Sequence, residues 1–285
     1  MDLTNSDVLM PILKKYGFYT KKGLGQHFLM NKEAVDLIVE KAAAHNLPIL
    51  EIGPGVGTVT RQLAETGLEV LAVEIDYRAM GVLRETVGKF DSVTVVHDDF
   101  LKVDLPQLLA GKRWVVVGNL PYYITSPIIE ILLENHSFFH AMYFLLQIEV
   151  VDRLSSPPGS KVYSSLSVFA QTFANVNKLM KVPGDSFMPP PRVDSAIVEF
   201  LMHEKPLAAD DIRELFFKIV RASFGQRRKT ILNSLNASAV IDGEKSVVEK
   251  LLTDAGIMPV QRAETVSIEQ FLQLAKLVRE FEKCM

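Results

Sequence analysis

The stretch from Ile49 to Thr58 reads ILEIGPGVGT. Its first four residues form a short apolar run, which is typical of a buried strand. The glycines that follow let the backbone turn sharply and approach a ligand closely. A helix-like segment, Val56 to Glu65, comes next, and a helix N-terminus favours a phosphate or carboxylate. The stretch therefore predicts a strand, a tight turn and a helix, with a nucleotide site at the turn.

Similar apolar runs recur along the chain, beginning with this one. They are Ile49 to Ile52, Val70 to Ile75, Val93 to Val96, Trp114 to Val117 and Met142 to Leu146. Their hydrophobicity is continuous rather than alternating, which indicates strands buried on both faces, as in a doubly wound parallel α/β sheet. Two later runs, Val176 to Val182 and Ser195 to Met202, flank a proline-rich turn and predict a closing antiparallel hairpin.

The pattern changes to helical periodicity from Pro206 onward. We therefore expect a boundary near residues 203–207. The first domain would comprise residues 1–204, including a basic N-terminal extension over residues 1–30. Residues 205–285 would form a small α-helical domain that docks RNA.

Composition limits the possible classes of protein. The chain has 285 residues, 48% of them hydrophobic, which is enough for a substantial core. Its one cysteine, Cys284, excludes an intramolecular disulfide and a Cys-rich metal site, and we expect no metal. Asp2 and Asp7 stand where an export signal carries positive charge, and the most apolar region, residues 114–148, is interrupted by prolines and glutamates. We expect a cytoplasmic protein without a membrane span.

The net charge of −3 means that any nucleic-acid site is local. Two stretches carry cations and no acid, one between Asp7 and Glu33 and the other between Glu214 and Asp242. We interpret both as phosphate contacts rather than only solvated surface. The candidate RNA-binding residues in them are Lys21, Lys22, Arg221, Arg227, Arg228 and Lys229.

Two acids at strand ends strengthen the nucleotide site at Gly53 and Gly55. Glu74 comes 21 residues after Gly53, and Asp99 follows the third strand. Ligands of an open α/β sheet bind beyond the carboxyl ends of the strands, so both acids should meet the glycine turn. Glu74 would accept the ribose hydroxyls and Asp99 the exocyclic amine of a bound adenine. These residues alone suit an NAD dehydrogenase equally well.

The tetrapeptide Asn119-Leu120-Pro121-Tyr122 separates the two possibilities. It follows the strand at Trp114 and would enter the same crevice. Carbonyl oxygens of Asn119 and Leu120 could accept the hydrogens of an aromatic amine and so hold its lone pair on nitrogen. Tyr122 could stack on the base, and Pro121 would fix the turn. The pattern favours chemistry on the exocyclic amine of a nucleobase.

Several motifs in order resemble the KsgA/RsmA family of ribosomal RNA adenine dimethyltransferases. They are KGLGQHFL at 22–29, EIGPGVGTVT at 51–60, VEID at 73–76, DDFL at 98–101, NLPYYITSP at 119–127, FMPPPRVDSA at 187–196 and LFFKIVRASFGQRRKTILNSL at 215–235. The resemblance implies a Rossmann-like class I methyltransferase sheet of seven strands with a small C-terminal helical domain.

The resemblance also implies the reaction. It is dimethylation of N6 on two adjacent adenosines in the 3′-terminal hairpin loop of 16S ribosomal RNA, with S-adenosylmethionine as cofactor and S-adenosylhomocysteine as product. The implied partner is the immature 30S subunit, and the implied state is a monomer. By motif matching, the cofactor positions are His27, Leu29, Gly53, Gly55, Glu74, Asp99 and Asn119. Residues 119–122 would hold the base, with Phe187 stacking opposite Tyr122.

The chain departs from the family at His27, where Asn is usual. Either the His27 side chain or only its backbone could serve the cofactor.

Three alternatives remain open. An Erm-type enzyme would methylate large-subunit RNA, although the GQRRK segment resembles the small-subunit enzymes. A non-catalytic ribosome assembly factor could keep the fold. An NAD dehydrogenase lacks an obvious hydride-transfer constellation.

Overall fold

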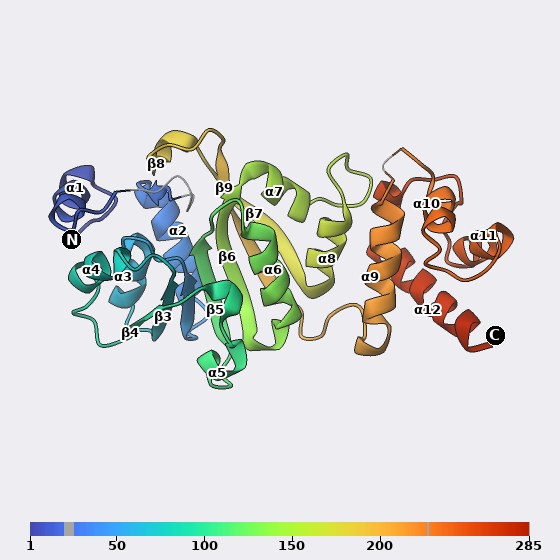
Figure 1. Cartoon of the computed structure of the whole chain (residues 1–285), viewed down its shortest axis with the longest axis horizontal. Coiled ribbons are helices and arrows are strands. Elements are labelled where there is room, and N and C mark those ends of the chain that lie inside the picture. Colours follow the sequence, from blue (N-terminus) through green and yellow to red (C-terminus); the bar gives the residue numbers. More distant parts are fainter. Residues whose placement is uncertain (20–25, 227, 285) are drawn as a thin grey trace. The chain divides into compact units, whose positions relative to one another are not determined.

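The structure is a computed structural model that describes residues 1–19, 26–226 and 228–284 (Figure 1). Contacts divide the chain into two compact units: the sheet unit, residues 1–151 and 175–202, and the helical unit, residues 152–174 and 203–285. Residues 152–174 thus pack with the later helices, whereas the boundary expected near 203–207 left them with the first part. The assignment of separate functions to the two parts stays a prediction.

Within the described residues, the main sheet has seven strands in the order β4-β3-β2-β5-β6-β9-β7. Their bounds are β2 Ile49–Ile52, β3 Val70–Glu74, β4 Val93–His97, β5 Trp114–Asn119, β6 Phe139–Gln147, β7 Ala174–Val182 and β9 Ser195–Met202. Strands β2 to β6 pair in parallel, and β9 lies antiparallel to β6. The predicted seven-stranded α/β fold is confirmed.

The order of the strands explains where a ligand can bind. Strand β2 lies between β3 and β5, with Ile49 opposite both Val70 and Val115. The chain therefore leaves β2 toward one side of the sheet first and crosses to the other side later. A crevice forms at such a switch point beyond the carboxyl ends of the strands.

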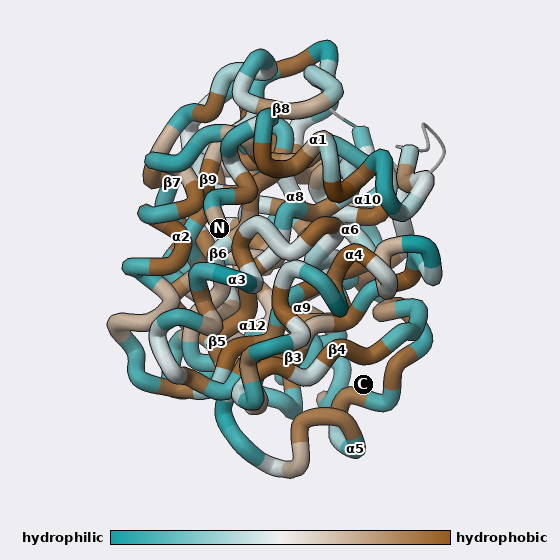
Figure 2. Tube along the Cα trace, turned by 90° about the vertical axis from the view of Figure 1, so that its left-hand side faces the viewer, coloured by the Kyte–Doolittle hydropathy of each residue, from teal (hydrophilic) through white to brown (hydrophobic). Residues whose placement is uncertain are grey.

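The central strands are buried on both faces, as their continuous hydrophobicity predicts. Every residue of β2 and β3 is buried, and so are the first five residues of β5. The edge strand β4 is only partly buried, because it pairs with β3 alone among the described strands. Figure 2 shows β3 and β4 largely in the colour of hydrophobic residues.

Helices cover the sheet of the sheet unit. They are α1 Ser6–Lys15, α2 Lys32–Ala43, α3 Thr58–Glu65, α4 Ala79–Thr86, α5 Leu105–Leu109 and α6 Thr125–Glu134, with 3-10 turns at Phe100–Lys102 (η2), His136–Phe138 (η3) and Gly184–Ser186 (η4). Helix α7 (Ile148–Leu154) begins in the sheet unit, and its residues from Asp152 onward belong to the helical unit. Val35 and Ile38 of α2 share one core cluster with Val115 of β5 and Tyr143 of β6. Helices α1 and α4 pack in a second cluster.

A separate two-stranded sheet joins distant parts of the sequence. Strand β1 (Phe28–Leu29) pairs antiparallel with β8 (Phe187–Met188), so Leu29 lies opposite Phe187. The Met30 amide extends the pairing by donating to the Ser186 carbonyl at 2.8 Å. The GQHFL and FMPPP motifs are therefore neighbours in space.

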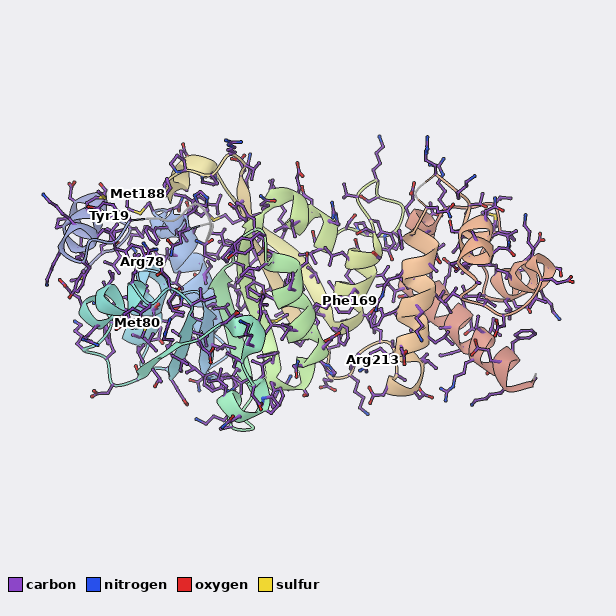
Figure 3. The ribbon with its side chains drawn as sticks, viewed as in Figure 1. Tyr19, Arg78, Met80, Phe169, Met188 and Arg213 are labelled. Carbon is purple, nitrogen blue, oxygen red and sulfur yellow. The ribbon has the colours of Figure 1, made fainter. Side chains whose placement is uncertain are left out.

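In the part of the helical unit that the structure describes there are five further helices and one 3-10 turn. They are α8 Ser165–Phe173, α9 Asp210–Phe224, α10 Ile231–Ser238, α11 Lys245–Asp254, α12 Ile268–Cys284 and η5 Ala263–Thr265. Phe169 and Phe173 of α8 contact Phe217 of α9, and the Arg213 guanidinium lies 5.5 Å from the centre of the Phe173 ring (Figure 3). In the ranges that the structure describes, no helix is both long and apolar enough to cross a membrane.

Candidate active site

A cavity lies in the sheet unit where the carboxyl ends of β2, β3, β4 and β5 meet. Seven predicted cofactor positions line it: His27, Leu29, Gly53, Gly55, Glu74, Asp99 and Asn119. Glu51, Thr58, Ile75 and Tyr123 also line it. The structure thus brings together residues from five separate sequence motifs, although their individual roles stay predictions.

The glycine turn has the backbone that its sequence requires. Gly55 and Gly57 have φ angles of +58° and +87°, in the left-handed region that favours glycine. A Cβ on Gly57 would lie 2.8 Å from Thr86 Oγ1, so this position also excludes a side chain by contact. The turn closes with a hydrogen bond from the Gly57 amide to the Pro54 carbonyl, and α3 begins directly after it.

Glu74 at the end of β3 binds the glycine turn. Its Oε2 accepts from the Gly55 amide at 2.9 Å, and its Oε1 accepts from the Asp76 amide at 2.7 Å. Burial raises the pKa of Glu74, while these backbone hydrogen bonds oppose the shift. A carboxylate oxygen has two lone-pair sites, so each can still accept a further hydrogen bond.

Asp99 lies at the start of η2. Its Oδ1 accepts from the Leu101 amide at 3.1 Å, and its Oδ2 lies 3.3 Å from the Lys102 ammonium. The neighbouring Asp98 also lines the cavity and accepts from the Asp99 amide. Asp99 thus combines the role of a helix cap with a place at the cavity.

Asn119 ends β5 with its amide at the cavity. Its Nδ2 donates to the His27 backbone carbonyl at 2.8 Å. Only the NH₂ group can donate to a carbonyl, so this hydrogen bond fixes which way the amide points and leaves Oδ1 as an acceptor. The preceding Gly118 lets β5 approach β2, because a Cβ there would lie 2.9 Å from the Ile52 carbonyl oxygen.

The other residues of the tetrapeptide have different surroundings. Pro121 lines the cavity, and Leu120 is buried in the core. The Tyr122 hydroxyl forms a 2.9 Å hydrogen bond with Ser195 Oγ, and burial raises the pKa of Tyr122. The Tyr122 ring lies 6.2 Å from the His27 ring, centre to centre, with an angle of 20° between the planes.

Phe187 lies apart from the cavity in this structure. Its side chain is 3% exposed, belongs to the core of the sheet unit and is absent from the cavity wall. The position is set by the pairing of β8 with β1, which places Phe187 opposite Leu29. Stacking of Phe187 on a base is therefore a prediction that requires the ring to become accessible.

Glu51 is a cavity residue that sequence reasoning missed as a functional group. It lies within β2, is 3% exposed, and its Oε2 has no hydrogen-bond partner among the described residues. Burial raises the pKa of Glu51 to about 7, and the nearby Glu74 carboxylate adds to the shift. The sequence feature that could have indicated its role is the position of this charged residue inside the otherwise apolar run Ile49–Ile52.

The candidate RNA-binding residues fall in two groups. Arg221, Arg228 and Lys229 are exposed in the helical unit. Lys21, Lys22 and Arg227 lie outside the described residues.

Comparisons with known proteins agree with this geometry. Residues 17–280 match the family described as ribosomal RNA adenine dimethylase. A Bacillus pumilus protein named ribosomal RNA small subunit methyltransferase A is 40% identical over 97% of this chain and 99% of its own length. A protein of the same name from Shouchella clausii is 41% identical over 95% of each chain.

Two solved structures share the architecture. The crystal structure of the 23S rRNA methyltransferase ErmE superposes with a TM-score of 0.70 at 29% identity, covering 88% of this chain and 99% of that one. A dimethyladenosine transferase from Plasmodium falciparum superposes with a TM-score of 0.76 at 26% identity, covering 90% and 98%.

Proposed function

The chain belongs to the ribosomal RNA adenine dimethylase family and dimethylates adenine in small-subunit RNA, and we propose S-adenosylmethionine as its methyl donor. The target is N6 of two adjacent adenosines in the 3′-terminal hairpin loop of 16S RNA. The observation that supports this most directly is the Asn119 amide, which the His27 carbonyl orients at the cavity.

The cavity has features that fit the cofactor. Glu51 offers a buried carboxylate oxygen without a hydrogen-bond partner among the described residues, which suits an ammonium group. Glu74 has lone pairs left for ribose hydroxyls, and Asp99 can accept from an adenine amine. S-adenosylmethionine supplies a methyl group on a positively charged sulfur. His27 and Leu29 would complete the cofactor wall.

The target base is recognised by Asn119 at the end of β5 and by the residues that follow it. Asn119 Oδ1 accepts a hydrogen of the exocyclic amine, because Nδ2 is already engaged with His27. This hydrogen bond holds electron density on nitrogen and so makes the amine a better nucleophile. The Leu120 carbonyl is the second acceptor, and the Tyr122 ring stacks on the base. Catalysis by this chain is mainly positioning and electrostatic stabilisation.

Exposed cationic side chains bind the RNA backbone. Arg221, Arg228 and Lys229 of the helical unit would contact phosphates, which positions the RNA without reading its sequence. Lys21, Lys22 and Arg227, outside the described residues, are proposed for the same role. The protein would act as a monomer on the immature 30S subunit in the cytoplasm.

The nearest rival is a large-subunit enzyme of the Erm type. ErmE shares the fold with this chain at 29% identity, whereas the relatives named small subunit methyltransferase A reach 40% and 41% over nearly the whole chain. A second rival is an assembly factor without catalysis. A cavity that retains Glu74, Asp99 and Asn119 supports the enzyme over a purely binding role.

One reconstitution separates these possibilities. Small and large subunits that lack the modification are incubated separately with the protein and methyl-labelled S-adenosylmethionine, and the RNA is digested to nucleosides. We expect dimethyladenosine from the small subunit alone, and its loss with Asn119→Ala. Label in the large subunit only would favour the Erm-type rival. Binding of the particle without transfer would favour the assembly factor.

A further inference from the structure

An ion pair between Asp76 and Arg78, with a buried acid and a half-buried cation, follows Glu74 in the sequence. Asp76, two residues after Glu74, is 7% exposed and accepts from Arg78 through both oxygens, at 2.9 Å from Nε and 2.5 Å from Nη2. Such a fork-shaped pair fixes both side chains in one orientation. Asp76 Oδ2 also accepts from Gln26 Nε2 at 2.9 Å. The carboxylate therefore holds a residue 50 positions earlier in the chain.

Arg78, the cation of this pair, also contacts the chain at Phe18 and Tyr19. Arg78 Nη1 donates to the Tyr19 carbonyl at 3.1 Å, and the two residues are labelled in Figure 3. The guanidinium carbon also lies 5.1 Å from the centre of the Phe18 ring. Arg78 thus contacts Phe18 and Tyr19, while Asp76 contacts both Arg78 and Gln26.

Gln26 leads directly into the residue that orients the Asn119 amide. His27 accepts from Asn119 Nδ2 through its carbonyl, and its Nδ1 lies 2.6 Å from the Pro189 carbonyl oxygen. The next residue begins β1, which pairs with β8. His27 is therefore held on one side by β-pairing and on the other by the contact of Gln26 with Asp76.

The loop after β3, which carries Asp76 and Arg78, also contacts Glu74 at the cavity. The Asp76 amide donates to Glu74 Oε1 at 2.7 Å, and Glu74 Oε2 accepts from Gly55. Hydrogen bonds link the glycine turn to Glu74, Glu74 to Asp76 and Asp76 to the Gln26 side chain, and the peptide bond then leads from Gln26 to His27. These contacts connect the glycine turn and Glu74 with His27, whose carbonyl accepts from Asn119.

We propose that the Asp76–Arg78 pair is a positioning device that holds Gln26 and His27 so that the His27 carbonyl orients the catalytic Asn119 amide. This proposal rests on the proposed function, because it assigns Asn119 a role in methyl transfer. Asp76 touches neither substrate nor the transferred methyl group. It acts through Gln26 and His27.

The test is a double-mutant cycle in single-turnover methyl transfer with enzyme and S-adenosylmethionine in excess over small subunits. Asp76→Asn keeps the side-chain shape but loses the charged pair with Arg78. We expect the transfer rate to fall about tenfold, while the Kd for S-adenosylmethionine, measured by calorimetry, changes less than about threefold. In an Asn119→Ala background, Asp76→Asn should cause almost no further loss, because non-additivity marks residues that act through one another.

A matched control is Glu85→Gln, which removes the acid of the Lys15–Glu85 pair, in which Lys15 is exposed and Glu85 is half-buried. Its transfer rate should equal that of the wild type. Arg78→Lys is the milder second variant, because the Arg78 side chain is 32% exposed and its charge is kept. It should lower the rate in the same direction. The rate of amide hydrogen exchange at residues 26–29 should rise in Asp76→Asn and in Arg78→Lys, and it should stay unchanged in Glu85→Gln.

Three results would overturn the proposal. One is a wild-type rate in folded Asp76→Asn or Arg78→Lys protein. Another is a further tenfold fall in the transfer rate when Asp76→Asn is added to Asn119→Ala, because a merely structural role of Asp76 would give such an additive loss. The third is a loss that is explained wholly by weaker cofactor binding. Failure of the proposed function looks different, since wild-type protein would then transfer no methyl group to the small subunit.

Discussion

The side-chain amide of Asn119 donates to the backbone carbonyl of His27 across 2.8 Å, joining residues 92 positions apart. This hydrogen bond sets the direction of the Asn119 carbonyl oxygen, the group proposed to accept from the target amine. It also makes the position of β1 part of the site. The orientation of the catalytic amide therefore depends on how the N-terminal segment folds back on the sheet.

Asn119→Asp should separate orientation from side-chain size. Aspartate has nearly the same shape, but an ionised carboxylate cannot donate to the His27 carbonyl. We expect the single-turnover rate to fall about 100-fold, the magnitude seen when one preorganised hydrogen-bonding group is lost. Asn135→Asp is a matched control, because Asn135 Nδ2 also donates to a backbone carbonyl at 2.8 Å and lies outside the cavity wall. Equal losses in the two variants would contradict a special role for Asn119.

Tyr122 should act through its ring rather than its hydroxyl. Tyr122→Phe loses only the hydrogen bond to Ser195, so transfer should stay within about threefold of wild type. Tyr122→Ala loses stacking worth about 1–3 kcal/mol per base, so transfer at low RNA concentration should fall about 10- to 100-fold. Tyr77→Ala, an exposed tyrosine outside the cavity wall, is the control. A Phe variant as defective as the Ala variant would assign the role to the hydroxyl.

The central fold was predictable because its strands are buried on both faces. Continuous apolar runs such as Ile49–Ile52 have few alternatives to a parallel sheet, and the structure places β2 at those residues. Helix α1 was not predicted, because the N-terminal segment was interpreted from its charge rather than its periodicity. The assignment of residues 152–174 to the helical unit depends on tertiary contacts, such as Phe169 against Phe217, that local patterns do not encode.

The site was predictable where its residues follow strand ends. Glu74, Asp99 and Asn119 line one cavity because the carboxyl ends of parallel strands share an edge. The pairing of β1 with β8 was not predicted, since two-residue strands carry no periodic signal. That pairing buries Phe187 and fixes His27. The role of Asp76 was equally hidden, because an acid in a loop gives no sign of its partners.

Gly57→Ala should cost more stability than a glycine substitution of equal backbone strain. Gly57 and Gly67 have similar positive φ angles, +87° and +79°. A Cβ at Gly67 meets nothing within 4 Å, whereas at Gly57 it meets Thr86, Val87 and Leu83 between 2.8 and 3.3 Å. We expect about 1 kcal/mol for Gly67→Ala and a further 1–3 kcal/mol for Gly57→Ala in urea unfolding. Equal losses would mean that α4 moves aside freely.

Arg228 and Lys229 should contribute to RNA binding through phosphate charge. Each phosphate contact that is lost lowers the slope of log K against log salt by about 0.7 to 0.9. Replacing both residues with alanine should therefore reduce the slope by about 1.5, in filter-binding titrations between low and moderate salt. Lys89→Ala with Lys112→Ala removes two exposed cations from the sheet unit as a control. An unchanged slope in the first variant would refute phosphate contact by these residues.

Glu51 should make the folded protein less stable as pH rises toward neutrality. Burial raises the pKa of Glu51 from 4.5 to about 7, so between these values the folded chain binds a proton that the unfolded chain has released. The stability that this proton provides is complete below pH 4.5 and is lost as pH rises through about 7. Glu51→Gln removes the titration while it keeps the shape of the side chain.

The free energy of unfolding of Glu51→Gln, minus that of the wild type, should therefore increase by up to about 3 kcal/mol between pH 5 and pH 8. Comparing the two proteins in urea at each pH cancels the other titrating groups. Glu85→Gln is a control for the direction of the effect, because the hydrogen bond from Lys15 lowers the pKa of half-buried Glu85. Its difference from the wild type should be small and confined to acidic pH. A Glu51→Gln difference that stays flat across this range would mean that Glu51 is charged in the fold at pH 5, with a partner for its carboxylate.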